Sequence, residues 1–224
     1  MTSSSPSADP APRGGPLDEA GKRPARPRAS AVRRREALVE YVEIEHKYLV
    51  DDPAPLRAVL AGRGARPGPA VRQVDTYYNA PHRDLLETPV VTEWLRIRRT
   101  DGGASLNFKK WHLDDDGEAT HCDEYESDVT DAEAVRRTLR ALDFTQMVSV
   151  DKVREEWTLP GGRIAVAFDT LAGVGSFVEF EFKGDAETVP AAIEELAAFV
   201  GGLGVPLGER IHRGYPHMLL GRDR

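Results

Sequence analysis

Hydrophobic and charged residues alternate along much of the chain after about residue 41, and the first such stretch is the clearest. Between Val42 and Val50, the charged residues Glu43, Glu45 and Lys47 occupy every second position, and apolar residues fill most of the positions between them. Successive side chains of a β-strand point to opposite faces, so the stretch predicts a strand with one charged and one apolar face. Taken alone, such a strand would also fit an ordinary sheet with one face in water.

Strand-like stretches recur down the chain, and helical ones are fewer. Asp51-Asp52-Pro53 predicts the start of a helix, in which Leu56 and Leu60 have helical spacing before Gly62. Seven further strands are predicted, at residues 71–78, 90–99, 105–111, 121–129, 151–159, 163–171 and 176–183. Three later helices are predicted, at 131–142, 189–200 and 215–220. The expected class is α+β, mainly β, with an antiparallel closed or strongly curved sheet, because parallel winding would need more helices.

Composition and charge exclude several classes of function. The formal net charge is −7, and the first 37 residues hold eight basic and four acidic residues, which leaves about −11 for the rest. An acidic surface repels a nucleic-acid backbone, so a nucleic-acid partner is not expected. Cys122 is the single cysteine, which excludes an intrachain disulfide. No apolar run is long enough for a bilayer and the start lacks a signal-peptide core, so we expect a cytoplasmic protein without a membrane partner.

The first 36 residues differ in composition from the rest. They are rich in Ser, Pro, Ala, Gly and Arg, with too few large apolar side chains to offset the entropy of ordering. We therefore predict a disordered basic tail over residues 1–36 and one folded domain over residues 38–224.

Charged residues lie at alternate positions on several of the predicted strands. If the sheet curls with these faces inward, the interior holds Glu43, Glu45, Glu124, Glu126, Asp169, Glu179 and Glu181 beside Lys47, Arg96, Arg98, Lys109, Lys152 and Arg154. Buried charge is costly unless it is paired or ligated. A polyphosphate with a divalent metal would satisfy both signs, because basic groups bind phosphate oxygens and carboxylates bind Mg²⁺ or Mn²⁺. The pattern thus predicts a charged tunnel.

The motif Glu43-x-Glu45-x-Lys47 resembles the N-terminal signature of the CYTH superfamily, the triphosphate tunnel metalloenzymes. Further stretches resemble family motifs in the same order, so that the resemblance covers about residues 40–220: Asp75-Thr76-Tyr77-Tyr78, Leu95-Arg96-Ile97-Arg98, Leu106-Asn107-Phe108-Lys109, Glu124-Tyr125-Glu126, Lys152-Val153-Arg154, Asp169 and residues 175–181. The resemblance implies an eight-stranded antiparallel closed barrel with peripheral helices, which hydrolyses or cyclises triphosphate compounds with divalent metal. Asn107, Lys110 and Arg213-Gly214-Tyr215 depart from the family pattern, which leaves the substrate open.

The resemblance also implies roles for the charged residues. Substrate phosphates would be bound by Lys47, Arg96, Arg98, Lys109, Lys152 and Arg154. Mg²⁺ or Mn²⁺ would be held by Glu43, Glu45, Asp169, Glu179 and Glu181. The residues expected to be catalytic are Lys47, Lys152, Arg154, Glu124 and Glu126. In this scheme a metal-activated water attacks the terminal phosphorus of tripolyphosphate or of an organic triphosphate, such as thiamine triphosphate or a nucleotide.

Three functions remain open at this point. A hydrolase of small triphosphates is favoured, because the motifs address phosphate and metal and none clearly addresses adenine. A class IV adenylate cyclase would use a similar tunnel with the ribose 3′ oxygen as the nucleophile. A polyphosphate- or nucleotide-binding module without turnover is the third, although a decayed site would be expected to have lost some of its carboxylates. A homodimer is among the expected assemblies.

Overall fold

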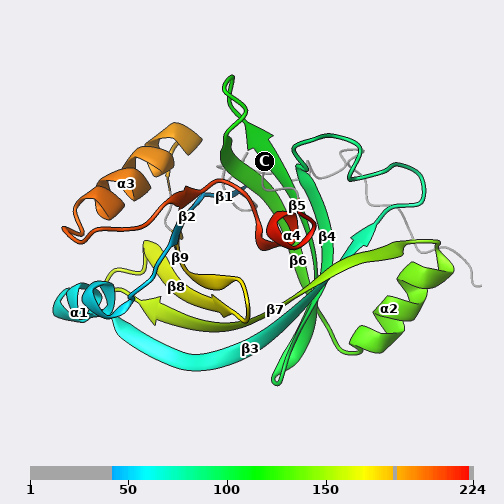
Figure 1. The fold of residues 1–224 in the computed structure, drawn as a ribbon, viewed down its shortest axis with the longest axis horizontal. Coiled ribbons are helices and arrows are strands. Elements are labelled where there is room, and N and C mark those ends of the chain that lie inside the picture. The colour runs from blue at the N-terminus through cyan, green and yellow to red at the C-terminus, as the bar shows by residue number, and fades with distance from the viewer. Residues whose placement is uncertain (1–41, 184–185, 222–224) are drawn as a thin grey trace, which may run out of the picture. The chain divides into compact units, whose positions relative to one another are not determined.

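The computed structural model describes residues 42–183 and 186–221, and the predicted tail at 1–36 lies outside the described residues. Within them, one antiparallel sheet forms the fold and the helices lie around it (Figure 1). The strands are β1 (Val42–Glu43), β2 (Glu45–Leu49), β3 (Arg66–Asn79), β4 (Glu93–Thr100), β5 (Gly103–Leu113), β6 (Ala119–Val129), β7 (Thr145–Thr158), β8 (Ile164–Leu171), β9 (Gly175–Phe182) and β10 (Arg210–Ile211). Their spatial order is β1-β6-β5-β4-β3-β7-β8-β9-β2-β10. The predicted class, α+β and mainly β, is confirmed.

The two ends of this sheet meet on one short segment of chain. β1 pairs with β6 through Glu43 and Cys122, whereas β2 pairs with β9 through Glu45 and Glu181. Ile44 alone separates β1 from β2, and its carbonyl oxygen accepts a hydrogen bond of 2.9 Å from the backbone N–H of Phe182 in β9. The sheet therefore curls back on itself and encloses an interior, called the lumen below.

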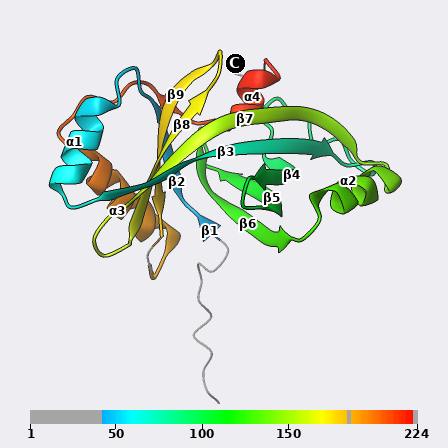
Figure 2. The ribbon, with the colours of Figure 1, turned by 90° about the horizontal axis from the view of Figure 1, so that it is seen from below.

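Two helices cover the outer face of β2, β8 and β9 (Figure 2). α1 (Ala54–Gly62) begins where the Asp52 carboxylate accepts a hydrogen bond of 2.9 Å from the backbone N–H of Ala54. α3 (Val189–Gly201) begins at Thr188, whose side chain caps its first turn. Apolar side chains of both helices pack against the strands, among them Leu60, Leu196 and Phe180. The outer side of these strands is the main hydrophobic core.

α2 (Ala132–Ala141) covers a different part of the sheet. Asp131 caps it by accepting hydrogen bonds of 2.9 Å from the backbone N–H groups of Glu133 and Ala134. Its Leu139 packs against Tyr78 of β3 and Ile97 of β4. The helix thus closes the outer face of the strands that carry Arg96 and Arg98 on the inside.

α4 (Tyr215–Leu219) lies over one end of the curled sheet (Figures 1 and 2). Tyr215 packs into a cluster with Tyr77, Trp94 and Phe177, and its ring centroid lies 5.2 Å from that of Phe177. One end of the lumen is therefore filled by aromatic and aliphatic side chains.

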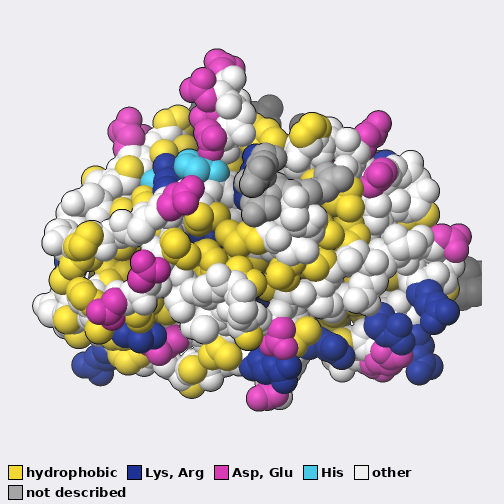
Figure 3. Space-filling view, viewed as in Figure 1, with side chains coloured by type: hydrophobic (Ala, Val, Ile, Leu, Met, Phe, Trp, Pro, Cys, Tyr) yellow, Lys and Arg dark blue, Asp and Glu magenta, His cyan; other side chains and the backbone are white. Residues whose placement is uncertain are grey.

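Element boundaries differ from the sequence expectation in two long strands. β3 begins at Arg66 and not at residue 71, because Pro67 and Ala70 still pair with β7 across a register shift. β7 begins at Thr145 and not at residue 151. A turn around residues 114–117 joins β5 to β6, and Figure 3 shows acidic side chains at the tip of this hairpin. Among the described residues, no helix is both long and apolar enough to cross a membrane.

Candidate active site

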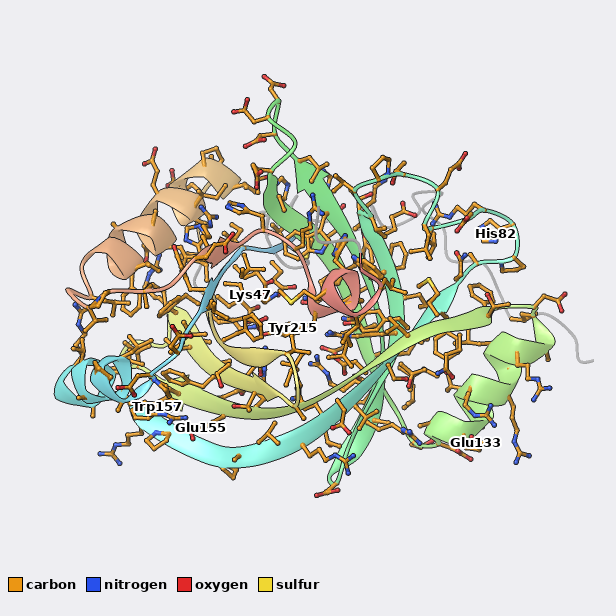
Figure 4. All side chains as sticks on the ribbon, in the orientation of Figure 1. Lys47, His82, Glu133, Glu155, Trp157 and Tyr215 are labelled. Atoms are coloured by element: carbon orange, nitrogen blue, oxygen red, sulfur yellow. The ribbon has the colours of Figure 1, made fainter. Side chains whose placement is uncertain are left out.

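The lumen is a cavity of about 860 Å³, part of which is open to solvent, and charged side chains line most of it. It contains twelve of the thirteen charged residues predicted to face inward: Glu43, Glu45, Lys47, Arg96, Arg98, Lys109, Glu124, Glu126, Lys152, Arg154, Glu179 and Glu181. The thirteenth, Asp169, is fully buried beneath this lining. Figure 4 shows Lys47 and Tyr215 inside the curled sheet, whereas Glu133 lies outside on α2.

Strand alternation explains why these side chains meet. Glu45 and Lys47 face the lumen from β2, while Ile44 and His46 lie on its other side. His46 is buried, as expected for a packed residue, and burial lowers the pKa of its imidazole to about 4. The predicted charged faces are therefore present on one continuous inner surface.

Asp75 of β3 holds the two arginines of β4. Its carboxylate accepts hydrogen bonds of 2.7 Å from both Nε and Nη2 of Arg98, and one of 3.2 Å from Nη1 of Arg96. Asp75 is 1% exposed; burial by itself would raise the pKa of its carboxyl, but Arg96 and Arg98 hold that pKa well below the usual range. The bidentate bonds fix the Arg98 guanidinium plane.

Asp169 of β8 binds the basic residues of β7, as Asp75 binds those of β4. Its oxygens accept hydrogen bonds from Lys152 Nζ at 2.8 Å, from Arg154 Nε and Nη2 at 2.8 and 2.7 Å, and from the Tyr215 hydroxyl at 2.8 Å. Burial raises the pKa of Asp169, but these cations outweigh burial and lower it. In this structure its oxygens accept hydrogen bonds from four donor atoms. Its role as a metal ligand stays a prediction.

The pKa of the Lys152 ammonium lies close to neutral pH, so this side chain can lose its charge. Burial lowers the pKa of its ammonium to about 8, and Arg154 beside it acts in the same direction. Lys47, equally buried, has a raised pKa because Glu179 and Glu45 outweigh its burial. Lys47 Nζ lies 3.0 Å from Glu179 Oε1, and Arg154 also contacts Glu179. The Tyr215 ring lies between the two lysines, with its centroid 4.4 Å from Lys47 Nζ and 5.0 Å from Lys152 Nζ.

Three carboxylates converge at another part of the lumen. Glu43, Glu124 and Glu181 each place an oxygen within 4.8 Å of the others. Burial raises the pKa of Glu181 to about 7, and the nearby Glu43 adds to the rise. Burial likewise raises the pKa of Glu45 to about 7, with Glu179 and Glu43 acting in the same direction against Lys47.

This cluster fits a divalent metal. Mg²⁺ and Mn²⁺ prefer oxygen ligands, and a cation would offset the burial and the neighbouring negative charges that together raise the pKa of Glu181. Glu43 and Glu181 were predicted as metal ligands, whereas Glu124 was predicted as catalytic. Glu124 also accepts a hydrogen bond of 2.7 Å from Asn107 Nδ2.

Several lumen residues were not singled out for the site from the sequence. They are Tyr77, Trp94, Asn107, Trp111, Glu156, Lys183 and Tyr215, with Asp75 beneath the arginines. The signal for two of them was available, because Asn107 and Trp111 share a strand face with Lys109. Asp75 could not be found in this way, since its partners lie on a neighbouring strand.

Known proteins resemble this chain over most of its length. A family model described as CYTH domain matches residues 42–215. A protein of Methanocaldococcus jannaschii named "Putative adenylate cyclase" is 27% identical over 175 residues, which are 78% of this chain and 96% of that protein. A solved structure of a Pyrococcus horikoshii OT3 protein is 25% identical, covers 80% of this chain and 99% of its own, and has a TM-score of 0.66. A Hippeastrum protein, described as an adenylyl cyclase homologue with a dominant triphosphatase activity, is 18% identical over 81% of this chain and 95% of its own, with a TM-score of 0.53.

Proposed function

The chain belongs to the CYTH domain family, and we propose that it is a divalent-metal-dependent hydrolase of small triphosphate compounds. The observation that carries the proposal is the inner surface itself. Seven basic residues line one cavity, the six predicted ones and Lys183, and a cluster of carboxylates lies beside them in the same space. A triphosphate with a divalent cation requires both kinds of group within one enclosed volume.

The basic residues bind and orient the phosphate chain. Asp75 accepts hydrogen bonds from Arg96 and Arg98, and Asp169 accepts them from Lys152 and Arg154. Each basic pair is therefore oriented in the lumen by one buried carboxylate. Arg98 uses Nε and Nη2 on Asp75, which leaves N–H groups of its Nη1 for a phosphate oxygen. Such preorganised cations favour the charge of phosphoryl transfer without reorganising during the reaction.

The carboxylates supply the metal ligands. Glu43, Glu124 and Glu181 form the centre of the proposed Mg²⁺ or Mn²⁺ site, and Glu45 and Glu179 line the same cavity. A divalent cation bound there would neutralise phosphate charge and lower the pKa of a water molecule, which provides the attacking oxygen.

Lys152 can release or hold a proton at Nζ near neutral pH, because its pKa is about 8. Its position beside Tyr215 and Arg154 places that proton at the phosphate-binding side of the lumen. Lys47, with its raised pKa, stays charged, and Glu126 accepts a hydrogen bond of 2.7 Å from Ser105 at the cavity wall. We assign Lys47 and Arg154 to charge stabilisation and Lys152 to proton transfer.

An adenylate cyclase is the second candidate. It is favoured by the name of the Methanocaldococcus jannaschii relative, which matches this chain over nearly its own full length. Both reactions use the same phosphate site and differ in the nucleophile, which is water in one and the ribose 3′ oxygen in the other.

Phosphorus NMR separates these activities. The full chain is incubated with Mg²⁺ or Mn²⁺ and with tripolyphosphate, thiamine triphosphate or ATP. A hydrolase releases inorganic phosphate from one or more of these compounds, whereas a cyclase produces cyclic AMP and pyrophosphate from ATP alone. Absence of both products with all three compounds would contradict the proposal.

A further inference from the structure

The segment that forms β10 and leads into α4 borders the lumen at Gly214. We call residues 210–214 the strap. Its first two residues pair with β2, opposite Tyr48 and Lys47, and Figure 1 shows the chain running from beside β2 to α4. On the way, His212 Nδ1 lies 2.6 Å from Glu118 Oε2 of the β5–β6 hairpin. The strap is thus tied to the sheet on both sides of the lumen.

Two smaller cavities open beside the strap. The first is lined by Val90, Val91, Trp111, Leu113, Gly117, Glu118, Ala119, His212, Arg213, Gly214 and His217. The second is lined by the strap together with Glu45 and Lys47, and it shares five residues with the first, among them Trp111 and Gly214. The same two residues also line the lumen, so Trp111 and Gly214 border all three spaces.

The first cavity, called the side cavity below, differs from the lumen in its chemistry. Its lining includes Val90, Val91 and Leu113, together with Trp111 near the end of β5. The lumen face of β5 therefore changes from Asn107 and Lys109 to an aromatic ring at the next inward position. Such a wall suits a flat, weakly polar group better than a phosphate.

His217 adds hydrogen-bonding capacity to the side cavity. The residue is 3% exposed, and neither ring nitrogen meets strict hydrogen-bond geometry, but the backbone of Gly214 and of Val91 lies close enough to act as a hydrogen-bond partner that raises its pKa. Burial, assisted by Arg213, lowers the pKa of His217 to about 4, so its imidazole is neutral at pH 7. A neutral imidazole has one N–H, which can donate to a backbone carbonyl, and its other nitrogen remains an acceptor for an N–H group of a heterocyclic base.

We propose that the side cavity is a subsite for the planar heterocyclic base of an organic triphosphate, stacked on Trp111, and this rests on the proposed triphosphate site in the lumen. Trp111 follows Lys109 on the same strand face, so their Cα atoms are about 7 Å apart. A sugar can span that distance between a base on Trp111 and a phosphate on Lys109. The substrate class is therefore a nucleotide-like triphosphate, and inorganic tripolyphosphate leaves the side cavity unused.

Binding of three ligands to the wild-type chain tests the subsite without requiring turnover. ATP, methyl triphosphate and tripolyphosphate are titrated calorimetrically without added metal. Stacking of one base on an aromatic ring should make ATP bind about tenfold more tightly than methyl triphosphate, which has no base. Equal affinity for these two ligands, or no binding of either, would overturn the subsite.

Variants of Trp111 localise the effect. Trp111→Leu should remove the preference for ATP, and Trp111→Phe should keep most of it because a ring remains. Tyr125→Leu is the matched control, since Tyr125 is an aromatic residue of the adjacent β6 that is 52% exposed and absent from the lumen lining. Thermal unfolding first establishes that each variant is folded.

The outcomes separate this inference from the proposed function. If Trp111→Leu weakens ATP and methyl triphosphate by the same factor, the base does not lie on Trp111. If the chain prefers ATP through Trp111 but releases no phosphate and no cyclic AMP, the subsite stands and the proposed hydrolase fails.

Discussion

Replacing Asp75 by asparagine should destabilise the protein strongly, because it removes the negative charge that two buried arginines share. The side chain of Asp75 is 2% exposed, and its oxygens accept hydrogen bonds from Arg96 and Arg98 at 2.7 to 3.2 Å. Asparagine keeps the shape but presents an NH₂ group to one guanidinium. Breaking a buried ion pair by neutralising one partner costs about 3 to 5 kcal/mol. We expect the free energy of unfolding to fall by about 3 kcal/mol.

A surface pair of similar geometry provides the control. Asp151 of β7 binds Arg72 of β3 through two hydrogen bonds of 2.9 and 2.5 Å, but its side chain is 52% exposed. Water replaces such bonds at little cost, so Asp151→Asn should change stability far less. Urea unfolding at pH 7 followed by circular dichroism measures both variants.

Addition of tripolyphosphate gives a second measurement on the same variants. An anion in the lumen can neutralise the arginines that Asp75→Asn leaves without their carboxylate, so the stability gap to wild type should narrow as tripolyphosphate is added. The reasoning fails if Asp75→Asn and Asp151→Asn cost the same. It fails equally if tripolyphosphate stabilises wild type more than the Asp75 variant.

Four further predictions concern the site and the tail. Arg98→Lys should lower kcat/KM on tripolyphosphate and ATP alike, by a loss of transition-state stabilisation of about 1.5 to 3 kcal/mol, because the charge remains while the bidentate fork is lost. If Arg98→Ala left kcat/KM unchanged on both substrates, the inward orientation of this strand would be contradicted. Glu179→Gln should lower kcat at least about a hundredfold, and chelation should abolish phosphate release until Mg²⁺ or Mn²⁺ is restored; full activity in excess chelator would exclude a metal role. Glu45 and Glu181 have pKa values raised to about 7, so the folded state binds more protons than the unfolded state between about pH 4.5 and 7, and stability should fall as pH rises through that range, less steeply in Glu181→Gln. Deletion of residues 1–36 should leave turnover of small triphosphates unchanged, and a folded but inactive truncation would place the tail in the site.

The inward set of charges could be predicted because it depends on local sequence alone. A strand exposes every second residue to one face, so Glu43, Glu45 and Lys47 share the lumen wherever the strand lies in the sheet. The resemblance of the ordered motifs to the CYTH superfamily then predicted that the sheet closes into a barrel.

Partnerships between strands could not be predicted in the same way. Asp75 lies opposite Arg98 because β3 and β4 pair in a particular register, and no local pattern states that register. The contacts of Asp169 with Lys152 and Arg154 likewise depend on the pairing of β8 with β7, which no local pattern predicts, and its role as a metal ligand stays a prediction. The start of β3 was missed because Pro67 and Gly68 are typical of turns, whereas a register shift keeps this segment paired with β7.

At Ile44 the first stretch of strand changes its pairing partner from β6 to β9, and this change also affects how the chain folds. Residues 42–49 are synthesised first among the strands, yet Glu45 pairs with Glu181 and Glu43 with Cys122. Loop closure over such sequence separations carries a large entropic cost before any contact compensates it. During synthesis on a ribosome, the backbone groups of β2 that pair with β9 therefore have no partner strand until β9 has been synthesised. The alternating charges along that edge, besides serving the lumen, keep a waiting strand from pairing with another chain.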